Sequence, residues 1–268
     1  MTRVSLIIVL ASILFISSCK ETAEVPEQKT TTTKMTPTIP YRLVNQFPHS
    51  TDAFTEGLQF VDGVMYESTG QYGNSYLTKY NLESGNMIKK VDIEPKYFGE
   101  GMTVMGDKIY MLTYKERTGF VFDKATFKLL KTFPLTTEEG WGMTNDSTNL
   151  IYSDGTSYIH FIDPETFQKT KQIEVMDNYG PVTNINELEY INGHIYANQW
   201  NTNYILKIDP NTGKVLGQSD LSNVRRQAGL PPSGYEDVLN GIAYDKNKNR
   251  ILITGKNWPK IFEVTLDN

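Results

Sequence analysis

Short apolar stretches alternate with polar turn residues along most of the chain, and the alternation repeats. Similar strand-turn-strand segments begin at Gly57, Gly101, Gly142, Glu187 and Gly241, at intervals of 44, 41, 45 and 54 residues. β-Branched and aromatic residues dominate these segments, and no long helical period interrupts them. The pattern therefore predicts an all-β repeat protein.

A second recurring turn completes each of the first four units. It has the sequences YNLESG from Tyr80, FDKATF from Phe122, IDPETF from Ile162 and IDPNTG from Ile208. The Asp-Pro-x-Thr form suits a type I turn, because proline favours the second turn position and aspartate accepts local hydrogen bonds. Each unit then holds four short strands in about 44 residues, which is the size of one β-propeller blade.

The last unit is too short for four strands of its own. Gly241–Asn268 has room for three, over Gly241–Tyr244, Arg250–Thr254 and Lys260–Leu266. Tyr41–Phe47, the one β-like stretch ahead of the first unit, can supply the fourth. Sharing the last blade between both ends of the chain removes an open sheet edge. We therefore predict a five-bladed propeller of four-stranded antiparallel blades, closed by an N-terminal strand.

The longest interval contains an insertion, Ser222–Val238. Its polar start favours a short helix, which Gly-Leu-Pro-Pro then ends. Insertions on one face of a repeat protein are often part of its binding face.

The first 40 residues have a different composition. Residues 1–19 combine Arg3, a largely apolar stretch and two small serines before Cys19, which is typical of a secretory signal peptide. The run ending in Cys19 resembles a bacterial lipobox, whose cysteine is lipidated; an ordinary signal or a free thiol are the alternatives. Residues 20–40 predict a flexible tether, since large apolar residues are scarce there. We expect residues 41–268 to form an extracytoplasmic domain, lipid-anchored to the bacterial cell envelope through Cys19.

Charge and cysteine content exclude several classes of partner. Of the 268 residues, 26 are basic and 31 acidic, which gives a net charge of −5. The sequence has no cluster of basic residues of the kind that binds a nucleic-acid phosphate backbone. Nucleic acid is therefore not an expected partner. The single cysteine excludes an internal disulfide and a thiolate metal site.

Superimposing the units predicts two rings of residues at one mouth of the central channel. The first ring precedes each innermost strand and the second follows each second strand. The first contains Glu56, Glu100, Trp141, Asn186 and Asn240, and the second Glu67, Tyr114, Asp154, Trp200 and Lys256. These residues form a binding site or, alternatively, pack adjacent blades. Convergent aromatic and polar groups favour a site.

Familiar catalytic motifs are missing from the sequence. It has no G-x-S-x-G, phosphate loop or H-E-x-x-H, and His49, His160 and His194 lack ligand spacing, which favours structural or solvated roles. Any reaction would therefore depend on a carboxylate assisted by a lysine or an amide.

Several long sequence segments, in the same order along the chain, resemble one family, the plant and bacterial type of glutaminyl-peptide cyclotransferase. They include FPHSTDAFTEGL, YESTGQYGNS, YFGEGMT, NELEYINGHIYANQW and TGKNWPKIFEV, and they span residues 47–268. The resemblance implies a five-bladed propeller enzyme that closes N-terminal glutamine of peptides or proteins into pyroglutamate and releases ammonia. It implies no cofactor, and we expect a monomer. A structural cation bound near Glu56 or Asp154 remains an alternative.

The resemblance also implies roles for individual residues. The family's acid/base glutamate falls on Glu100 and its polar site residues on Asn186 and Lys256. Its pocket aromatics fall on Phe54, Phe98, Trp141 and Trp200. Two positions depart from the plant enzyme: Glu56 stands where it has glutamine, and Tyr114 where the family has tryptophan, which puts the preference for glutamine over glutamate in doubt.

Two other functions stay open on the residues alone. A non-catalytic propeller could bind peptide or glycan ends at the same mouth. A metal-dependent lactonase or lyase could use Glu56, Glu100, Asn186 and Asn240 as ligands.

Overall fold

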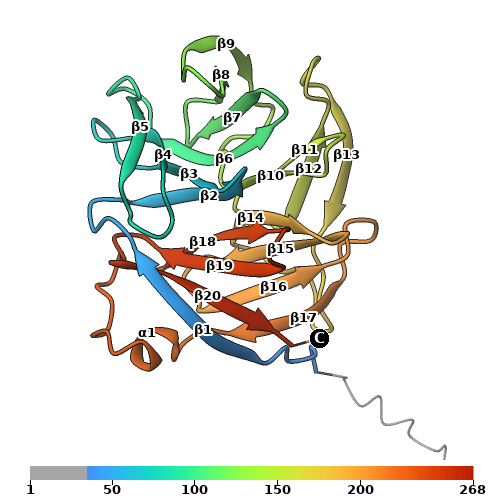
Figure 1. The fold of residues 1–268 in the computed structure, drawn as a ribbon. Coiled ribbons are helices and arrows are strands. Elements are labelled where there is room, and N and C mark those ends of the chain that lie inside the picture. Colours follow the sequence, from blue (N-terminus) through green and yellow to red (C-terminus); the bar gives the residue numbers. More distant parts are fainter. Residues whose placement is uncertain (1–34, 268) are drawn as a thin grey trace, which may run out of the picture. The chain divides into compact units, whose positions relative to one another are not determined.

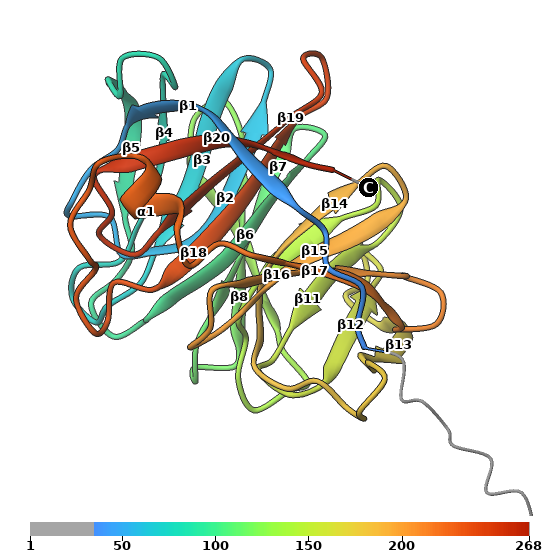
Figure 2. The same ribbon diagram turned by 90° about the horizontal axis from the view of Figure 1, so that it is seen from below.

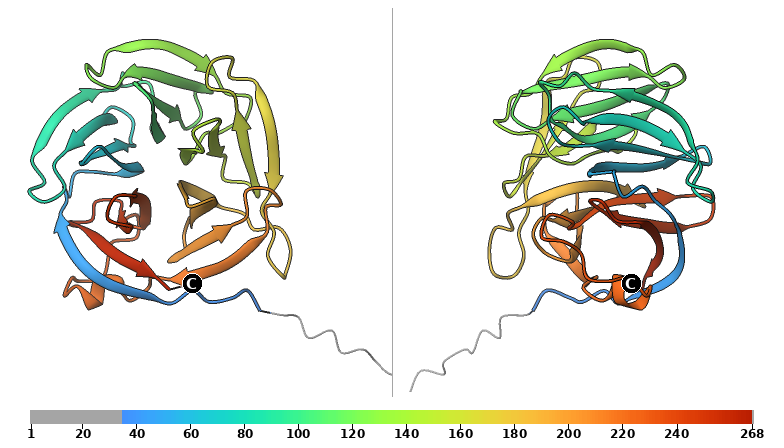
Figure 3. Two further views of the ribbon diagram at one scale, coloured as in Figure 1. Left: turned by 45° about the vertical axis from the view of Figure 1, so that its right-hand side comes forward. Right: turned by 90° about the vertical axis from the view of Figure 1, so that its left-hand side faces the viewer.

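The computed structural model describes residues 35–267, and Cys19 and the rest of the predicted signal peptide lie outside these residues. The described residues form five four-stranded antiparallel sheets arranged as blades around a channel (Figure 1; Figure 3, left). The all-β, five-bladed propeller predicted from the repeats is therefore confirmed.

Each of the first four blades is one continuous stretch of chain, ordered from the channel outward. The first contains β2 (Thr55–Val61), β3 (Val64–Thr69), β4 (Tyr76–Tyr80) and β5 (Met87–Asp92), and the second β6 (Gly99–Met105), β7 (Lys108–Thr113), β8 (Thr118–Asp123) and β9 (Leu129–Pro134). The third contains β10 (Met143–Asn145), β11 (Leu150–Ser153), β12 (Tyr158–Ile162) and β13 (Lys169–Glu174), and the fourth β14 (Ile185–Ile191), β15 (His194–Gln199), β16 (Tyr204–Ile208) and β17 (Val215–Asp220).

Both ends of the chain build the fifth blade. It contains β18 (Leu239–Asp245), β19 (Arg250–Gly255) and β20 (Lys260–Leu266), with β1 (Tyr41–Pro48) as its outer strand. β1 pairs antiparallel with β20, as Figures 1 and 2 show, and Tyr41 lies opposite Leu266. The predicted closure of the ring is therefore confirmed.

The apolar core is divided among the five interfaces between blades. One cluster fills each interface; Met111 and Phe122, for example, pack between the first and second blades, and Phe47 and Leu58 between the fifth and first. Each fully buried side chain of this size contributes about 1.5–3 kcal/mol from apolar burial. Inner strands such as β6 and β7 are buried along nearly their whole length, because each blade is covered on both faces by its neighbours.

The end of the predicted tether lies on the folded domain. Thr38 pairs in parallel with Gln218 of β17, the Ile39 N–H donates to the Gln218 carbonyl over 2.8 Å, and Ile39 is buried. The folded part therefore begins before Tyr41, which the entropy argument for residues 20–40 did not foresee. Within residues 35–267, no helix is long and apolar enough to cross a membrane.

The insertion between β17 and β18 contains the only α-helix of the described residues, α1 (Val224–Gln227). This short helix confirms the prediction for Ser222–Val238. The remainder of the insertion runs without regular structure to β18 and brings Tyr235 and Glu236 to the mouth of the channel.

Candidate active site

A β-bulge directs most of the first-ring residues toward the mouth. The register between the first two strands shifts at the start of four blades, and each shift contains one ring residue: Glu56, Glu100, Asn186 and Asn240. A bulge bends its strand and turns a side chain away from the regular pleat. Trp141 comes just before β10, so the third blade reaches the same level without a bulge.

The residue after each ring position approaches the neighbouring innermost strand. It is glycine in four units, and a Cβ on Gly57, Gly101 or Gly142 would meet the backbone of the next blade. The fourth unit has Glu187 instead. Its carboxylate accepts from the N–H of Leu58 over 3.0 Å and of Ile242 over 2.8 Å. Because the first and fourth blades are not neighbours, Glu187 crosses the channel beneath the ring.

A repeated backbone hydrogen bond defines the second ring. The N–H groups of Tyr114, Trp200 and Lys256 donate to carbonyls two residues before the first-ring positions, over 2.8–3.0 Å. In the first blade the same bond is made by Gly70, over 2.9 Å. The second-ring assignment of Glu67 was therefore wrong, and Gly70 takes that position. The ring of Phe98 occupies the space that a side chain on residue 70 would need.

Glu67 and Asp154 both turn away from the mouth, and neither lines the cavity. Glu67 accepts from Thr55 Oγ1 and lies beside His49, while Asp154 lies 2.9 Å from Nε2 of His160 and accepts from Thr156. The prediction that these two carboxylates face the channel mouth was wrong because each pairs with a nearby histidine.

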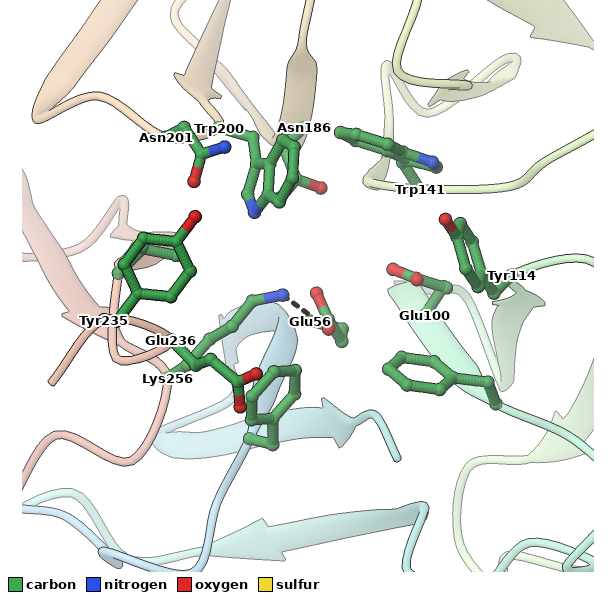
Figure 4. Close-up of a pocket in the computed structure, with 13 residues that line it drawn as sticks. Glu56, Glu100, Tyr114, Trp141, Asn186, Trp200, Asn201, Tyr235, Glu236 and Lys256 are labelled. Atoms are coloured by element: carbon green, nitrogen blue, oxygen red, sulfur yellow. Dashed lines mark hydrogen bonds and ion pairs between the residues drawn. The ribbon is translucent and has the colours of Figure 1, made fainter. Parts of the chain in front are cut away.

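The remaining predicted residues surround one cavity of about 340 Å³ (Figure 4). Nine of its lining residues were expected from the sequence: Phe54, Glu56, Phe98, Glu100, Tyr114, Trp141, Asn186, Trp200 and Lys256. Four more were not, namely Asn201, Tyr235, Glu236 and Val238. The insertion was the one sequence signal for the last three. Asn240 lies beneath the cavity, buried against Glu56.

A buried ion pair forms part of the cavity wall. Lys256 Nζ lies 2.6 Å from Glu56 Oε1, and Asn240 Nδ2 donates to Glu56 Oε2 over 3.2 Å. Both charged residues are more than nine-tenths buried. The Lys256 ammonium also lies 4.4 Å from the centre of the Phe54 ring, a favourable cation–π distance. This pair links the fifth blade to the first.

Glu100 faces the same carboxylate. Burial raises its pKa well above the usual range, the negative charge of Glu56 raises it further, and Lys256 opposes the rise. Burial also raises the pKa of Glu56, and the adjacent Lys256 ammonium opposes part of this rise. Of these two carboxyl groups, Glu100 therefore holds a proton more readily, while the Lys256 ammonium favours the ionised form of Glu56.

Aromatic rings form the other walls. Phe98 packs edge-on to Phe54 at 6.3 Å and lies 5.7 Å from Tyr114, measured between ring centroids. On the opposite side Trp141 and Trp200 meet edge to face at 5.6 Å. In Figure 4 the Trp200 indole nitrogen points into the cavity between these walls.

Asn186 retains unused hydrogen-bonding capacity. Its backbone carbonyl accepts from Ser153 Oγ over 2.8 Å, which fixes the residue, but Oδ1 is buried and has no partner among the described residues. Buried amide oxygens are nearly always paired in proteins. An unpaired amide on a cavity wall is therefore suited to a bound ligand.

The carboxylates considered as cation ligands are already engaged by other groups. Within residues 35–267, no three His, Cys, Asp or Glu side chains are grouped as metal ligands. The Glu56 oxygens already contact an ammonium and an amide N–H, and a cation there would be repelled by Lys256. Asp154 is likewise engaged by His160 and Thr156.

The fold and the site together define a class: a five-bladed propeller with two neighbouring carboxyl groups, a buried ion pair and aromatic walls at one mouth. The chain belongs to the glutamine cyclotransferase family, whose pattern matches residues 12–266. It is 40% identical over 227 residues to the glutaminyl-peptide cyclotransferase of Arabidopsis thaliana, covering 84% of this chain and 70% of that protein. The Myxococcus xanthus glutaminyl cyclase crystal structure superposes with a TM-score of 0.80 at 35% identity, covering 87% of this chain and 99% of that one. The resemblance stated from the sequence is confirmed.

Proposed function

We propose that this protein is a glutaminyl-peptide cyclotransferase, which converts the N-terminal glutamine of a peptide or protein to pyroglutamate and releases ammonia. The observation that supports this most directly is Glu100, a carboxyl group with a raised pKa in an aromatic cavity, next to the Glu56–Lys256 ion pair. Family membership supports the same reaction.

Glu100 is suited to move the proton that this reaction must transfer. The α-amine attacks the side-chain amide carbon, loses a proton, and forms the ring C–N bond, while the amide nitrogen gains a proton and leaves as ammonia. An α-ammonium group has a pKa of about 7.7–8.0, and a carboxyl whose pKa is raised exchanges protons with it more readily than an exposed one. In its ionised form, Glu100 takes the proton from the amine and then returns it to the leaving nitrogen.

The cavity also offers donors for the charge that develops on the amide oxygen. Only one of the three ammonium hydrogens of Lys256 is needed for Glu56, and the Asn186 amide and Trp200 N–H lie on adjoining walls. Oriented donors of this kind lower the barrier to a tetrahedral intermediate. The aromatic walls hold the flexible glutamine side chain folded onto its own amine.

An ammonia assay tests this function. The wild-type domain should release ammonia from Gln-β-naphthylamide, and Glu100→Gln should lower kcat by about 10²–10⁴-fold, the usual contribution of general acid–base catalysis. Glu138→Gln is the matched control, since Glu138 is exposed and pairs with Arg117 outside the cavity. Tight peptide binding without ammonia release by the wild type would favour the binding-protein alternative, and near-normal turnover of Glu100→Gln would refute the assigned acid/base residue.

We further propose that the protein is a bacterial envelope lipoprotein, attached through Cys19 and acting as a monomer. The sequence of residues 1–19 supports the anchor. Cys19→Ser should move the protein from the membrane fraction to the soluble fraction, and the released domain should sediment as a monomer. Unchanged membrane fractionation of the variant would contradict the anchor.

A further inference from the structure

His49 is a buried titratable group that the proposed reaction does not use. It follows β1, and its side chain is about 1% exposed. Nδ1 lies 2.6 Å from the Trp258 carbonyl oxygen, and Nε2 lies 3.0 and 3.2 Å from the two carboxylate oxygens of Glu67.

Both partners of the ring are acceptors, so both ring nitrogens must carry hydrogen. A carbonyl oxygen can only accept, and an ionised carboxylate can only accept. Glu67 Oε1 also accepts from Thr55 Oγ1 over 2.7 Å, a bond that favours the ionised form. Burial by itself would lower the pKa of His49, but the charge of Glu67 and the bonds to Glu67 and Trp258 raise it overall, while His49 holds the pKa of Glu67 low despite burial.

Other titratable groups around the imidazole are uncharged phenols. Tyr80 lies 6.3 Å from His49 between ring centroids, and Tyr76 lines the same small cavity beside the imidazole. Burial and the charge of Glu67 raise the pKa of both phenols. Glu67 is therefore the one ionised group that faces the imidazole among the described residues.

The partners of His49 lie directly behind the site. Trp258 follows Lys256 by two residues, and Thr55 immediately precedes Glu56. A hydrogen bond also joins these two stretches directly: the Asn257 N–H donates to the Ala53 carbonyl over 2.8 Å. The imidazole thus contacts the backbone that presents Lys256 and, through Glu67, the strand that presents Glu56.

We infer that His49 is a positioning residue for the reaction: as a buried imidazolium it ties the backbone behind Lys256 to the strand behind Glu56, and so fixes the ion pair that faces Glu100. This inference rests on the proposed function. Its effect on catalysis is indirect, because His49 does not line the cavity.

The protonation state can be tested without an activity assay. In the ¹⁵N-histidine-labelled protein at pH 7–8, both ring nitrogens of His49 should give protonated, slowly exchanging signals, with the spectrum assigned by comparison with His49→Gln. A neutral ring with one unprotonated nitrogen would overturn the inference.

Kinetics test the positioning. His49→Gln should lower kcat/KM by about 10–100-fold in protein that remains folded, because a shift of about 1 Å at a catalytic group has an effect of that size. The loss should lie mainly in kcat. His160→Gln is the matched control, since His160 also pairs with a largely buried carboxylate, Asp154, but has no bond to the Lys256 loop.

A second variant separates positioning from stability. His49→Gln/Glu67→Gln leaves no unpaired buried charge, so it should regain thermal stability but not kcat. Wild-type kcat in either folded variant would overturn the inference while leaving the proposed function intact. A wild-type protein that releases no ammonia would overturn both.

Discussion

Replacing Lys256 by methionine removes the charge that faces Glu56 and keeps an unbranched side chain. The pair is buried, and its atoms are 2.6 Å apart. Removing one partner of a buried ion pair costs about 3–5 kcal/mol, because an uncompensated charge remains. Glu56 can avoid part of this cost by taking a proton, so we expect about 3 kcal/mol. For a domain of this size that lowers Tm by about 6–12 °C.

The cost should depend on pH in a defined direction. Without Lys256, burial raises the pKa of Glu56 in the folded state further above its unfolded value. A carboxyl whose folded-state pKa is raised contributes stability below its unfolded pKa, and that contribution is lost as pH rises through the folded pKa. The variant should therefore be close to wild type near pH 4 and fall behind it toward pH 8.

Thermal and urea unfolding followed by circular dichroism, at pH 5 and pH 8, provide the measurement. Lys256→Met/Glu56→Gln removes both charges and should recover most of the stability lost in Lys256→Met, while ammonia release stays low. The reasoning fails if the single and double variants are equally destabilised, or if the loss at pH 5 equals the loss at pH 8.

Three further outcomes follow from the site. Glu56→Gln removes a negative charge beside Glu100 and so lowers its pKa; in kcat/KM measured from pH 5 to 10, the limb set by Glu100 should move to lower pH, and an unmoved profile would exclude their coupling. Gly70→Ala places a methyl group into the Phe98 ring; overpacking should cost about 1–3 kcal/mol in urea unfolding and raise KM, whereas a neutral result would show that the wall can move. Glu236 adds a carboxylate to the cavity rim, so the wild type should prefer Gln-Lys over Gln-Glu peptides by a few fold at low salt, and Glu236→Gln should abolish that preference.

Much of the first ring could be predicted because one local rule recurs. Glu56, Glu100 and Asn186 lie before similar strands, and the same bulge presents each of them. The sequence repeat was therefore enough to locate these residues, although it did not predict the bulge.

The second ring was harder to predict because it depends on where each second strand ends. β3 ends at Thr69, so the equivalent position is Gly70, which has no side chain to suggest a site. Glu67 lies three residues earlier, and its charge was the only feature that favoured placing it in the second ring. Asp154 has the expected position, but His160 on the next strand determines where its carboxylate points.

The rim and the N-terminal segment escaped prediction for different reasons. Tyr235 is 94% exposed and belongs to a loop with no period, so its place on the mouth depends on tertiary structure. Ile39 belongs to a segment too polar to fold alone, but it needs no core of its own because it pairs with the existing edge of β17.

The carboxylate of Glu187, which bonds to the first and fifth blades beneath the ring, turns the channel into a cup with a floor. A polypeptide cannot thread through such a floor, so a substrate must enter and leave by the mouth of the cavity. In the proposed reaction, ammonia and the cyclised terminus both leave through the opening by which the next substrate arrives. Product release and substrate binding therefore compete for one opening. We expect product release to limit turnover at high substrate concentration.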